Sequence, residues 1–223
     1  MPFYTGMNDI ASRPAVPPTF GFYAILTDPL AGYERLTRIC VDRGVAFVQL
    51  RMKNADERAV LETARLMRRI TAGTQTRLIV NDYPAASRDS GADGVHVGQS
   101  DLPYAQVRAI VGPDAIVGVS THSPRQTAAA CAFGPDYIGV GPVFPTPTKK
   151  TADPAIGVDG MKRMLEIATV PAVVLGSITP DNLPDILRAG ARNFSMVRPV
   201  NQAADPDAVV RRIMDVWRSV AAR

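Results

Sequence analysis

The chain has few of the residues from which disulfides, metal clusters and membrane anchors are built. It has two cysteines in 223 residues, Cys40 and Cys131, and neither lies in a Cys-x-x-Cys motif. Both fall in expected helices, which favours reduced, buried thiols over a disulfide or a metal site. No apolar run approaches the ~20 residues that span a bilayer, and the N-terminus shows no secretory pattern. We therefore expect a cytoplasmic protein without a membrane partner.

Blocks of like charge are also missing. The formal net charge is +4 and the pI is about 9.3, but the basic residues are spread along the chain. This distribution argues against nucleic acid as a partner, and a pocket for small anions explains part of the excess equally well. The composition, with 46% hydrophobic and 21% charged residues, is typical of a globular protein. A homo-oligomer is compatible with this composition, which does not specify one.

The chain does have a regular alternation of apolar and amphipathic segments. Residues 1–20 carry four prolines and little periodicity, and we interpret them as an N-terminal extension. The expected strands are 21–27, 46–51, 77–81, 94–97, 115–119, 137–141, 172–176 and 193–198. The helical stretches are clearest at 33–43, 55–71, 103–111, 124–132, 158–168, 181–189 and 206–221.

Strands that alternate with helices predict a parallel sheet with right-handed crossovers. Eight such units predict a single α/β domain over residues 21–223, a (β/α)8 TIM barrel. A doubly wound open sheet is the alternative, but it normally has fewer strands, and no Gly-rich dinucleotide fingerprint follows the first strand. Active sites of TIM barrels lie in the loops after the strands, so polar residues at the strand ends are the candidates for chemistry.

Charged residues of both signs follow strands two to four. Gln49, Arg51 and Lys53 stand at alternate positions and therefore point to one face. Two cations that converge there are costly unless an anion neutralises them; pairing with surface acids is the alternative. Asp82 and Asp101 follow the next two strands, where two carboxylates can share one Mg²⁺ with waters and phosphate oxygens. Helix capping is the alternative for both.

Strand five brings Gly118, Ser120 and His122 to one face. Ser120 is a candidate donor to a phosphate oxygen, and we expect Gly118 to leave room for a ligand. His122 suits acid–base chemistry, but hydroxyl residues on both sides of it suit helix capping, so a structural role is preferred. His96, inside an apolar strand, is expected to be a core residue.

The longest break between expected elements runs from residue 142 to about 157 and contains Thr146, Thr148 and Lys149. A loop of this length in a compact barrel is usually functional, as a lid or a ligand clamp. We expect Lys149 to approach a phosphate.

Gly176 and Arg198 are expected to end strands seven and eight, where these barrels often bind phosphate. Backbone amides near Gly176 and the guanidinium of Arg198 suit that purpose.

In their order and spacing, these segments resemble the thiamine phosphate synthase family from about residue 21 to the C-terminus. The matching segments are Gln-Leu-Arg-x-Lys at 49–53, Asn-Asp at 81–82, Gly-Gln-Ser-Asp at 98–101, Gly-Val-Ser-Thr-His at 118–122 and Gly-Pro-Val-Phe-Pro-Thr-Pro-Thr-Lys at 141–149. The resemblance implies a transferase of thiamine biosynthesis with Mg²⁺ as cofactor. It would join a pyrimidine pyrophosphate to a thiazole phosphate through a carbocation-like ionisation and release pyrophosphate.

The resemblance also implies roles for individual residues. The residues that it implies contact the pyrimidine pyrophosphate are Gln49, Arg51, Lys53, Asn81, Ser120 and Lys149. Among these, Arg51, Lys53 and Lys149 would be catalytic, because they stabilise the departing charge. Asp82 and Asp101 would bind Mg²⁺. Contacts with the thiazole phosphate fall to Thr146, Thr148, Gly176, Val197 and Arg198.

Two positions depart from the family pattern, both in the thiazole-phosphate half of the site. The family usually has Gly-Gly-Ile where this chain has Gly176-Ser177-Ile178, and a serine where it has Arg198. Ser177 adds a Cβ where the backbone is expected to approach the ligand or adopt a positive φ. Arg198 either strengthens phosphate binding or crowds the pocket.

Two other functions stay open for this sequence. One is a thiazole tautomerase of the same superfamily, in which His122 would transfer the proton. The other is a non-catalytic barrel that binds thiamine precursors. The intact pyrophosphate half argues against the tautomerase, whereas only turnover separates the synthase from a binding barrel.

Overall fold

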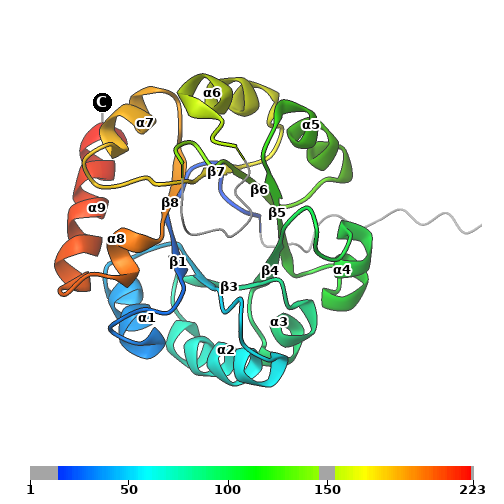
Figure 1. Cartoon of the computed structure of the whole chain (residues 1–223). Helices are drawn as coiled ribbons and strands as arrows, with labels where there is room; N and C mark the ends of the chain where they lie inside the picture. Colours follow the sequence, from blue (N-terminus) through cyan, green and yellow to red (C-terminus); the bar gives the residue numbers. More distant parts are fainter. Residues whose placement is uncertain (1–14, 146–153, 222–223) are drawn as a thin grey trace, which may run out of the picture.

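The computed structural model describes residues 15–145 and 154–221. Eight parallel strands close into a barrel in sequence order, and helices surround it (Figure 1). The strands are β1 (Gly21–Leu26), β2 (Phe47–Leu50), β3 (Arg77–Asn81), β4 (Gly94–Val97), β5 (Ile116–Thr121), β6 (Tyr137–Val140), β7 (Ala172–Val174) and β8 (Asn193–Met196). The helices are α1 (Tyr33–Asp42), α2 (Glu57–Thr71), α3 (Pro84–Ser90), α4 (Tyr104–Val111), α5 (Pro124–Phe133), α6 (Gly157–Ile167), α7 (Leu183–Arg188), α8 (Arg198–Asn201) and α9 (Pro206–Ala221). The predicted (β/α)8 TIM barrel is confirmed.

The sheet separates two hydrophobic cores, one inside the barrel and one between the strands and the helices. In β1, Tyr23 and Ile25 point into the barrel, where they pack with aromatic and aliphatic residues of other strands. Phe22 and Leu26 belong to the outer core between the sheet and the helices. Because both faces of the sheet are covered, the strands are mostly apolar on both faces, and few polar residues, such as Gln49 and His96, are buried in them. A polar residue that points into the barrel therefore stands out against this background.

The structure corrects several predicted boundaries. Helices α3 and α8 were not expected, because both are short; α3 begins at a proline and contains two serines, so its apolar periodicity is weak. The strands predicted at 172–176 and 193–198 end earlier, at Val174 and Met196. Gly176 therefore lies in the loop after β7, and Arg198 is the first residue of α8.

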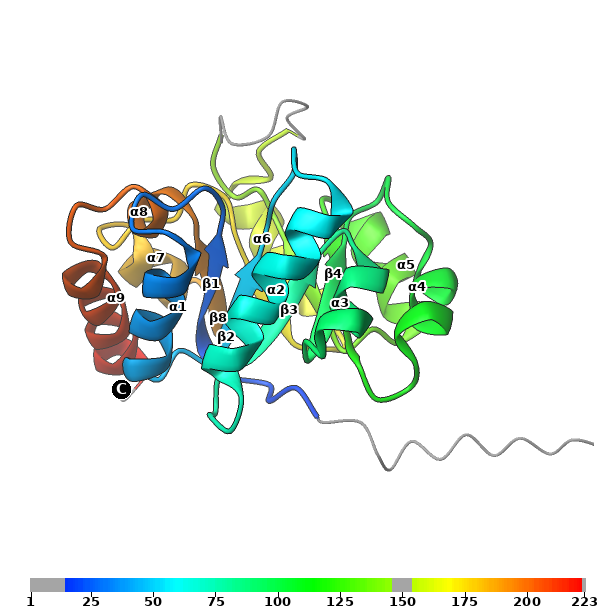
Figure 2. The same ribbon diagram turned by 90° about the horizontal axis from the view of Figure 1, so that it is seen from below.

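Residues 15–20 pass beneath the barrel, at the end opposite the loops that follow the strands (Figure 2). The ring of Phe20 is buried and packs 4.6 Å from that of Phe47 inside the barrel. The side chain of Asn193 accepts hydrogen bonds from the amides of Phe20 and Gly21 and donates one to the carbonyl of Pro18. This segment covers the lower end of the barrel and leaves the upper end for the site.

The structure bears on two predictions from the sequence, one about disulfides and one about membrane-spanning segments. Cys40 in α1 is a buried free thiol and Cys131 in α5 is a half-buried one, so the two do not form a disulfide. In the described ranges, no helix is long and apolar enough to cross a membrane.

Candidate active site

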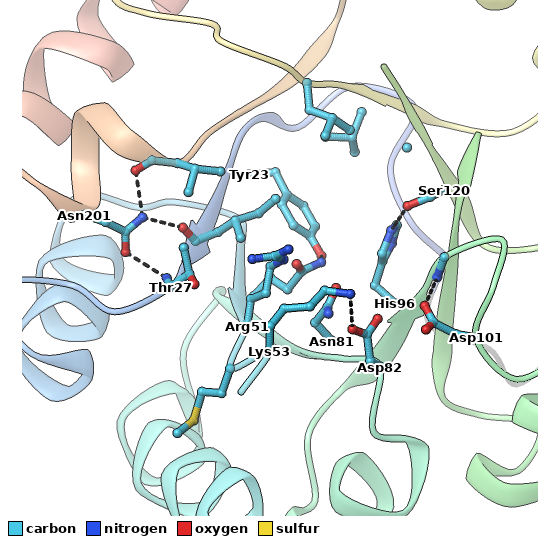
Figure 3. A pocket seen from close by; sticks show the side chains of 18 of the residues that line it. Tyr23, Thr27, Arg51, Lys53, Asn81, Asp82, His96, Asp101, Ser120 and Asn201 are labelled. Carbon is cyan, nitrogen blue, oxygen red and sulfur yellow. Dashed lines mark hydrogen bonds and ion pairs between the residues drawn. The ribbon is translucent and has the colours of Figure 1, made fainter. Parts of the chain in front are cut away.

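A cavity of about 1250 Å³ opens at the carboxyl ends of the strands (Figure 3). Nine of the predicted site residues line it: Gln49, Arg51, Lys53, Asn81, Asp82, Asp101, Ser120, Val197 and Arg198. Gly176 is not among the described residues that line it. Thr146, Thr148 and Lys149 lie outside the described residues. The fold thus brings together candidates that are separated by up to 149 positions in the sequence, from Gln49 to Arg198.

The two cations after β2 differ in their surroundings. Arg51 is half-buried, and burial lowers the pKa of its guanidinium, while the carboxylates of Asp82 and Asp28 partly oppose that shift. Lys53 is more exposed, and its Nζ lies 2.8 Å from Oδ2 of Asp82. The alternative was that Lys53 pairs with an acidic residue on the protein surface. Its partner is instead Asp82, and both residues line the cavity.

The two predicted metal ligands lie close together and do not cap helices. Asp82 has a φ of 66°, and its amide donates to the carbonyl of His96 at 2.9 Å. Burial raises the pKa of Asp82, the ion pair with Lys53 lowers it, and the nearby carboxylate of Asp101 raises it. The carboxylate of Asp101 accepts from the amide of Gly98 at 2.6 Å. The N-cap residues of α3 and α4 are Tyr83 and Pro103, so the capping alternative is wrong for both aspartates.

A chain of polar side chains forms the floor of the cavity. Nε2 of Gln49 donates to the hydroxyl of Tyr23 at 3.0 Å, and this hydroxyl lies 2.7 Å from that of Tyr137. The Tyr137 hydroxyl lies 3.0 Å from Nδ1 of His96, whose Nε2 lies 2.8 Å from Oγ of Ser120. Sequence reasoning assigned His96 to the core, where it is buried, but did not predict that it also lines the cavity. It missed Tyr23 and Tyr137 as site residues, because an aromatic residue in an apolar strand looks like ordinary core.

Two glycines make room for this chain of side chains. A Cβ at Gly118 would overlap the ring of Tyr137. A Cβ at Gly139 would lie 3.5 Å from Cε1 of His96 and 3.3 Å from the side chain of Leu175. The expectation that Gly118 leaves space for a ligand is therefore wrong, since Tyr137 already occupies that space.

His122 is held by backbone contacts beside the cavity. Its Nδ1 lies 2.5 Å from the carbonyl oxygen of Gly141, and its amide donates to the side chain of Gln126. The next residue, Ser123, is the N-cap of α5 and accepts from the amide of Gln126. These contacts agree with the structural role that was preferred for His122, although the residue also lines the cavity.

The opposite side of the cavity is braced by Asn201, which is 2% exposed. Its side-chain oxygen accepts from the amide of Thr27 at 2.9 Å, and its side-chain nitrogen donates to the carbonyls of Ile25 and Val197 at 2.7 Å. Figure 3 shows Asn201 between the end of β1 and the start of α8. Asn201 thus fixes the backbone that carries Val197 and Arg198 relative to β1. No signal in the sequence pointed to it.

The loop after β7 contains both the predicted glycine and the departure beside it. Gly176 has a φ of 111°, and a Cβ there would lie 2.5 Å from Cα of Pro142. Ser177 has a φ of 49°, which confirms that this position needs the left-handed region. Its hydroxyl donates to the carbonyl of Pro145 at 2.7 Å. Close packing against Pro142 already requires Gly176, and its contact with a thiazole phosphate stays a prediction.

The sequence and the fold are similar to those of known proteins. The sequence model of the family described as thiamine monophosphate synthase matches residues 23–200. A thiamine-phosphate synthase of Vibrio campbellii is 36% identical over 189 residues, which cover 85% of this chain and 93% of that protein. One from Gloeobacter violaceus is 42% identical over 82% of this chain and 53% of its own length. Among solved structures, a thiamine phosphate pyrophosphorylase from Pyrococcus furiosus aligns with a TM-score of 0.83 at 27% identity, covering 90% of this chain and 96% of that one.

Proposed function

Since the chain belongs to the thiamine monophosphate synthase family, we propose that it synthesises thiamine phosphate. The substrates would be 4-amino-2-methyl-5-hydroxymethylpyrimidine pyrophosphate and 4-methyl-5-(2-hydroxyethyl)thiazole phosphate, and the second product would be pyrophosphate. One observation in the cavity supports this most directly. Two cations and two carboxylates from the ends of β2, β3 and β4 converge on one site.

The reaction needs stabilisation of charge more than it needs a nucleophilic side chain. The bond between the pyrimidine methylene carbon and the pyrophosphate oxygen breaks, and its electron pair leaves with pyrophosphate. The ring amino group stabilises the resulting cation, and the thiazole nitrogen then forms the new bond to carbon. Arg51 and Lys53 would hold the negative charge that develops on the leaving group, and Ser120 would donate a hydrogen bond to it. The predicted roles of Gly176, Thr146, Thr148 and Lys149 stay predictions.

The donor set fits a magnesium ion. Asp82 and Asp101 offer hard oxygen ligands, and burial together with the nearby carboxylate of Asp101 raises the pKa of Asp82. In the described part of the chain, no group of three or more acidic, histidine or cysteine residues forms a closed metal cage. Mg²⁺ commonly binds one or two carboxylates and completes its octahedron with waters and phosphate oxygens. When bound, the ion would supply positive charge next to the pyrophosphate, while Lys53 keeps Asp82 in place.

The test is pyrophosphate release by the purified protein when it is mixed with the pyrimidine pyrophosphate and Mg²⁺. The mixture is run with and without the thiazole phosphate. Release coupled to thiamine phosphate formation would support the proposal. Release that does not depend on the thiazole would mean that the ionising half works and that the acceptor is another molecule. Absence of release in both mixtures would contradict the synthase.

A further inference from the structure

The side chains on the cavity floor form one continuous chain of hydrogen bonds that crosses the barrel. It runs from Gln49 on β2 through Tyr23 on β1, Tyr137 on β6 and His96 on β4 to Ser120 on β5. The four contacts are between 2.7 and 3.0 Å long. Figure 3 shows the last of them, between His96 and Ser120. The family resemblance implies a substrate contact for Gln49 and the proposed reaction uses Ser120, but neither gives a role to the three residues between them.

With the Gln49 amide as donor to Tyr23 and a neutral His96, one direction of proton donation satisfies all four hydrogen bonds. A tyrosine hydroxyl has one proton to donate, and Tyr23 accepts from the amide of Gln49, so its own proton goes to Tyr137. Tyr137 then donates to Nδ1 of His96. A neutral imidazole with Nδ1 as acceptor carries its proton on Nε2, and this nitrogen therefore donates to Oγ of Ser120.

If the hydrogen bonds ran in the opposite direction, the hydroxyl proton of Tyr23 would have no acceptor among these side chains. Ser120 would donate to His96, His96 to Tyr137 and Tyr137 to Tyr23. The Tyr23 hydroxyl would then accept two hydrogen bonds, one from Tyr137 and one from Gln49, and its own proton would have neither of these groups as acceptor. Buried polar groups are almost always satisfied, which favours the first direction.

Burial keeps the two tyrosine hydroxyls in this series of hydrogen bonds protonated. Tyr23 and Tyr137 are both buried, and desolvation raises the pKa of each phenol above its ordinary value. Both hydroxyls therefore keep their protons at neutral pH. Gly118 and Gly139 provide the space in which the rings of Tyr137 and His96 stack with centroids 5.5 Å apart. The position of the imidazole is thus set by packing as well as by hydrogen bonds.

From this geometry we propose that His96 is a positioning residue. Its hydrogen bond orients the hydroxyl of Ser120 so that this hydroxyl donates its proton to the leaving group. Because Oγ of Ser120 accepts from Nε2 of His96, its own proton is directed away from His96 and remains for an anion in the cavity. Without His96 the hydroxyl could rotate and donate elsewhere. The direction of these hydrogen bonds follows from the orientation of the Gln49 amide and from a neutral His96; only the identity of the anion rests on the proposed function.

A first experiment measures the histidine tautomer without any turnover. The chain has two histidines, so ¹⁵N-histidine labelling gives two sets of ring signals, which a His122→Gln variant assigns. The expected result is a neutral His96 with its proton on Nε2, and a shift toward mixed tautomers in Tyr137→Phe, which removes the donor to Nδ1. A proton on Nδ1 in the unmodified protein would overturn the proposal. Because this readout needs no substrate, it separates failure of the inference from failure of the synthase assignment.

A second experiment measures the coupling of His96 to Ser120 in steady-state kinetics. His96→Leu should lower kcat by ~10–10²-fold, less than the ~10²–10³-fold cost of removing a donor itself, because Ser120 remains, and leave KM for the thiazole phosphate unchanged. In a Ser120→Ala background the same substitution should cost little more, because the two residues act as a unit. His96→Gln offers an amide donor in the place of Nε2 and should recover at least ~10-fold of the loss. Additive losses, or no recovery with glutamine in a protein of normal thermal stability, would overturn the proposal.

Discussion

Arg51 is expected to contribute more to catalysis than Lys53, although both cations line the cavity. Arg51 is half-buried, and burial lowers the pKa of its guanidinium, so it sits where water screens charge poorly. A unit charge about 4 Å from an anionic oxygen is worth about 4 kcal/mol at an effective dielectric constant of about 20. The substrate already carries negative charge, so only the increase during bond breaking lowers the barrier. We therefore expect Arg51→Ala to lower kcat by ~10²–10³-fold, the measured scale for one such donor.

Lys53 gives an internal comparison. Its side chain is 47% exposed and already paired with Asp82, so solvent screens part of its effect. Lys53→Ala should therefore lower kcat by only about 10-fold. Arg51→Lys keeps the charge but loses the planar fork that binds two phosphate oxygens at once, and its activity should fall between the two alanine variants.

The assay is steady-state thiamine phosphate formation with Mg²⁺ in excess, and thermal melts show whether each variant is folded. Arg58→Ala is the matched control, because Arg58 lies on α2 with its side chain 88% exposed and pairs with Glu62 one turn away. It should keep activity within about 2-fold, since such surface pairs contribute little. A folded Arg51→Ala protein with a kcat within about 3-fold of the unmodified one would refute the role assigned to Arg51.

Further predictions concern the metal, the acceptor, alkaline pH and backbone strain. EDTA should abolish product formation and added Mg²⁺ should restore it; full activity in EDTA would contradict metal binding by Asp82 and Asp101. Arg198→Ser should change KM for the thiazole phosphate more than KM for the pyrimidine, and an unchanged thiazole KM would show that Arg198 does not bind the acceptor. Burial raises the pKa of the Tyr137 phenol in the folded protein, so above pH ~10 the unfolded chain loses this proton first. The free energy of unfolding should therefore fall as pH rises, by up to about 1.4 kcal/mol per pH unit. Tyr137→Phe should remove that part of the slope in urea titrations across pH 9.5–11.5, whereas an unchanged slope would argue against burial of a neutral phenol. Ser177→Gly should be about 0.5–1 kcal/mol more stable to urea than Ser177→Ala, because both lose the hydroxyl and only alanine keeps the strain of a positive φ; equal stabilities would show that the strain is negligible.

The sequence was sufficient for the barrel and for one side of the cavity. In a parallel barrel the carboxyl ends of successive strands meet at one rim, so residues that follow strands two, three and four must converge once the strands are placed. Arg51, Lys53, Asp82 and Asp101 needed no further information, because their positions along the chain determine their positions in the fold. The alternative of helix capping failed for both aspartates because the caps fall on other residues, Tyr83 and Pro103.

The floor of the cavity was beyond sequence reasoning for a physical reason. Tyr23 and Tyr137 are 114 positions apart, and their hydroxyls meet only because β1 and β6 face each other across the barrel. Periodicity reports which face of a strand a residue occupies, but it does not report which side chain lies opposite. Gly118 illustrates the same limit: the missing Cβ was visible in the sequence, but the ring that fills its place comes from another strand.

The two departures from the family pattern fall where the backbone is held by side-chain amides of other residues, Asn201 and Asn182. Asn201 binds the carbonyls of Ile25 and Val197, so the turn that carries Arg198 keeps its place whatever side chain follows Val197. Ser177 has an accommodating partner of its own, the carbonyl of Pro145, and its backbone carbonyl accepts from Asn182. Substitution at these positions can therefore alter recognition of the acceptor without moving the cations and carboxylates across the cavity. This separation is why the acceptor KM and the pyrophosphate-release step should respond to different residues.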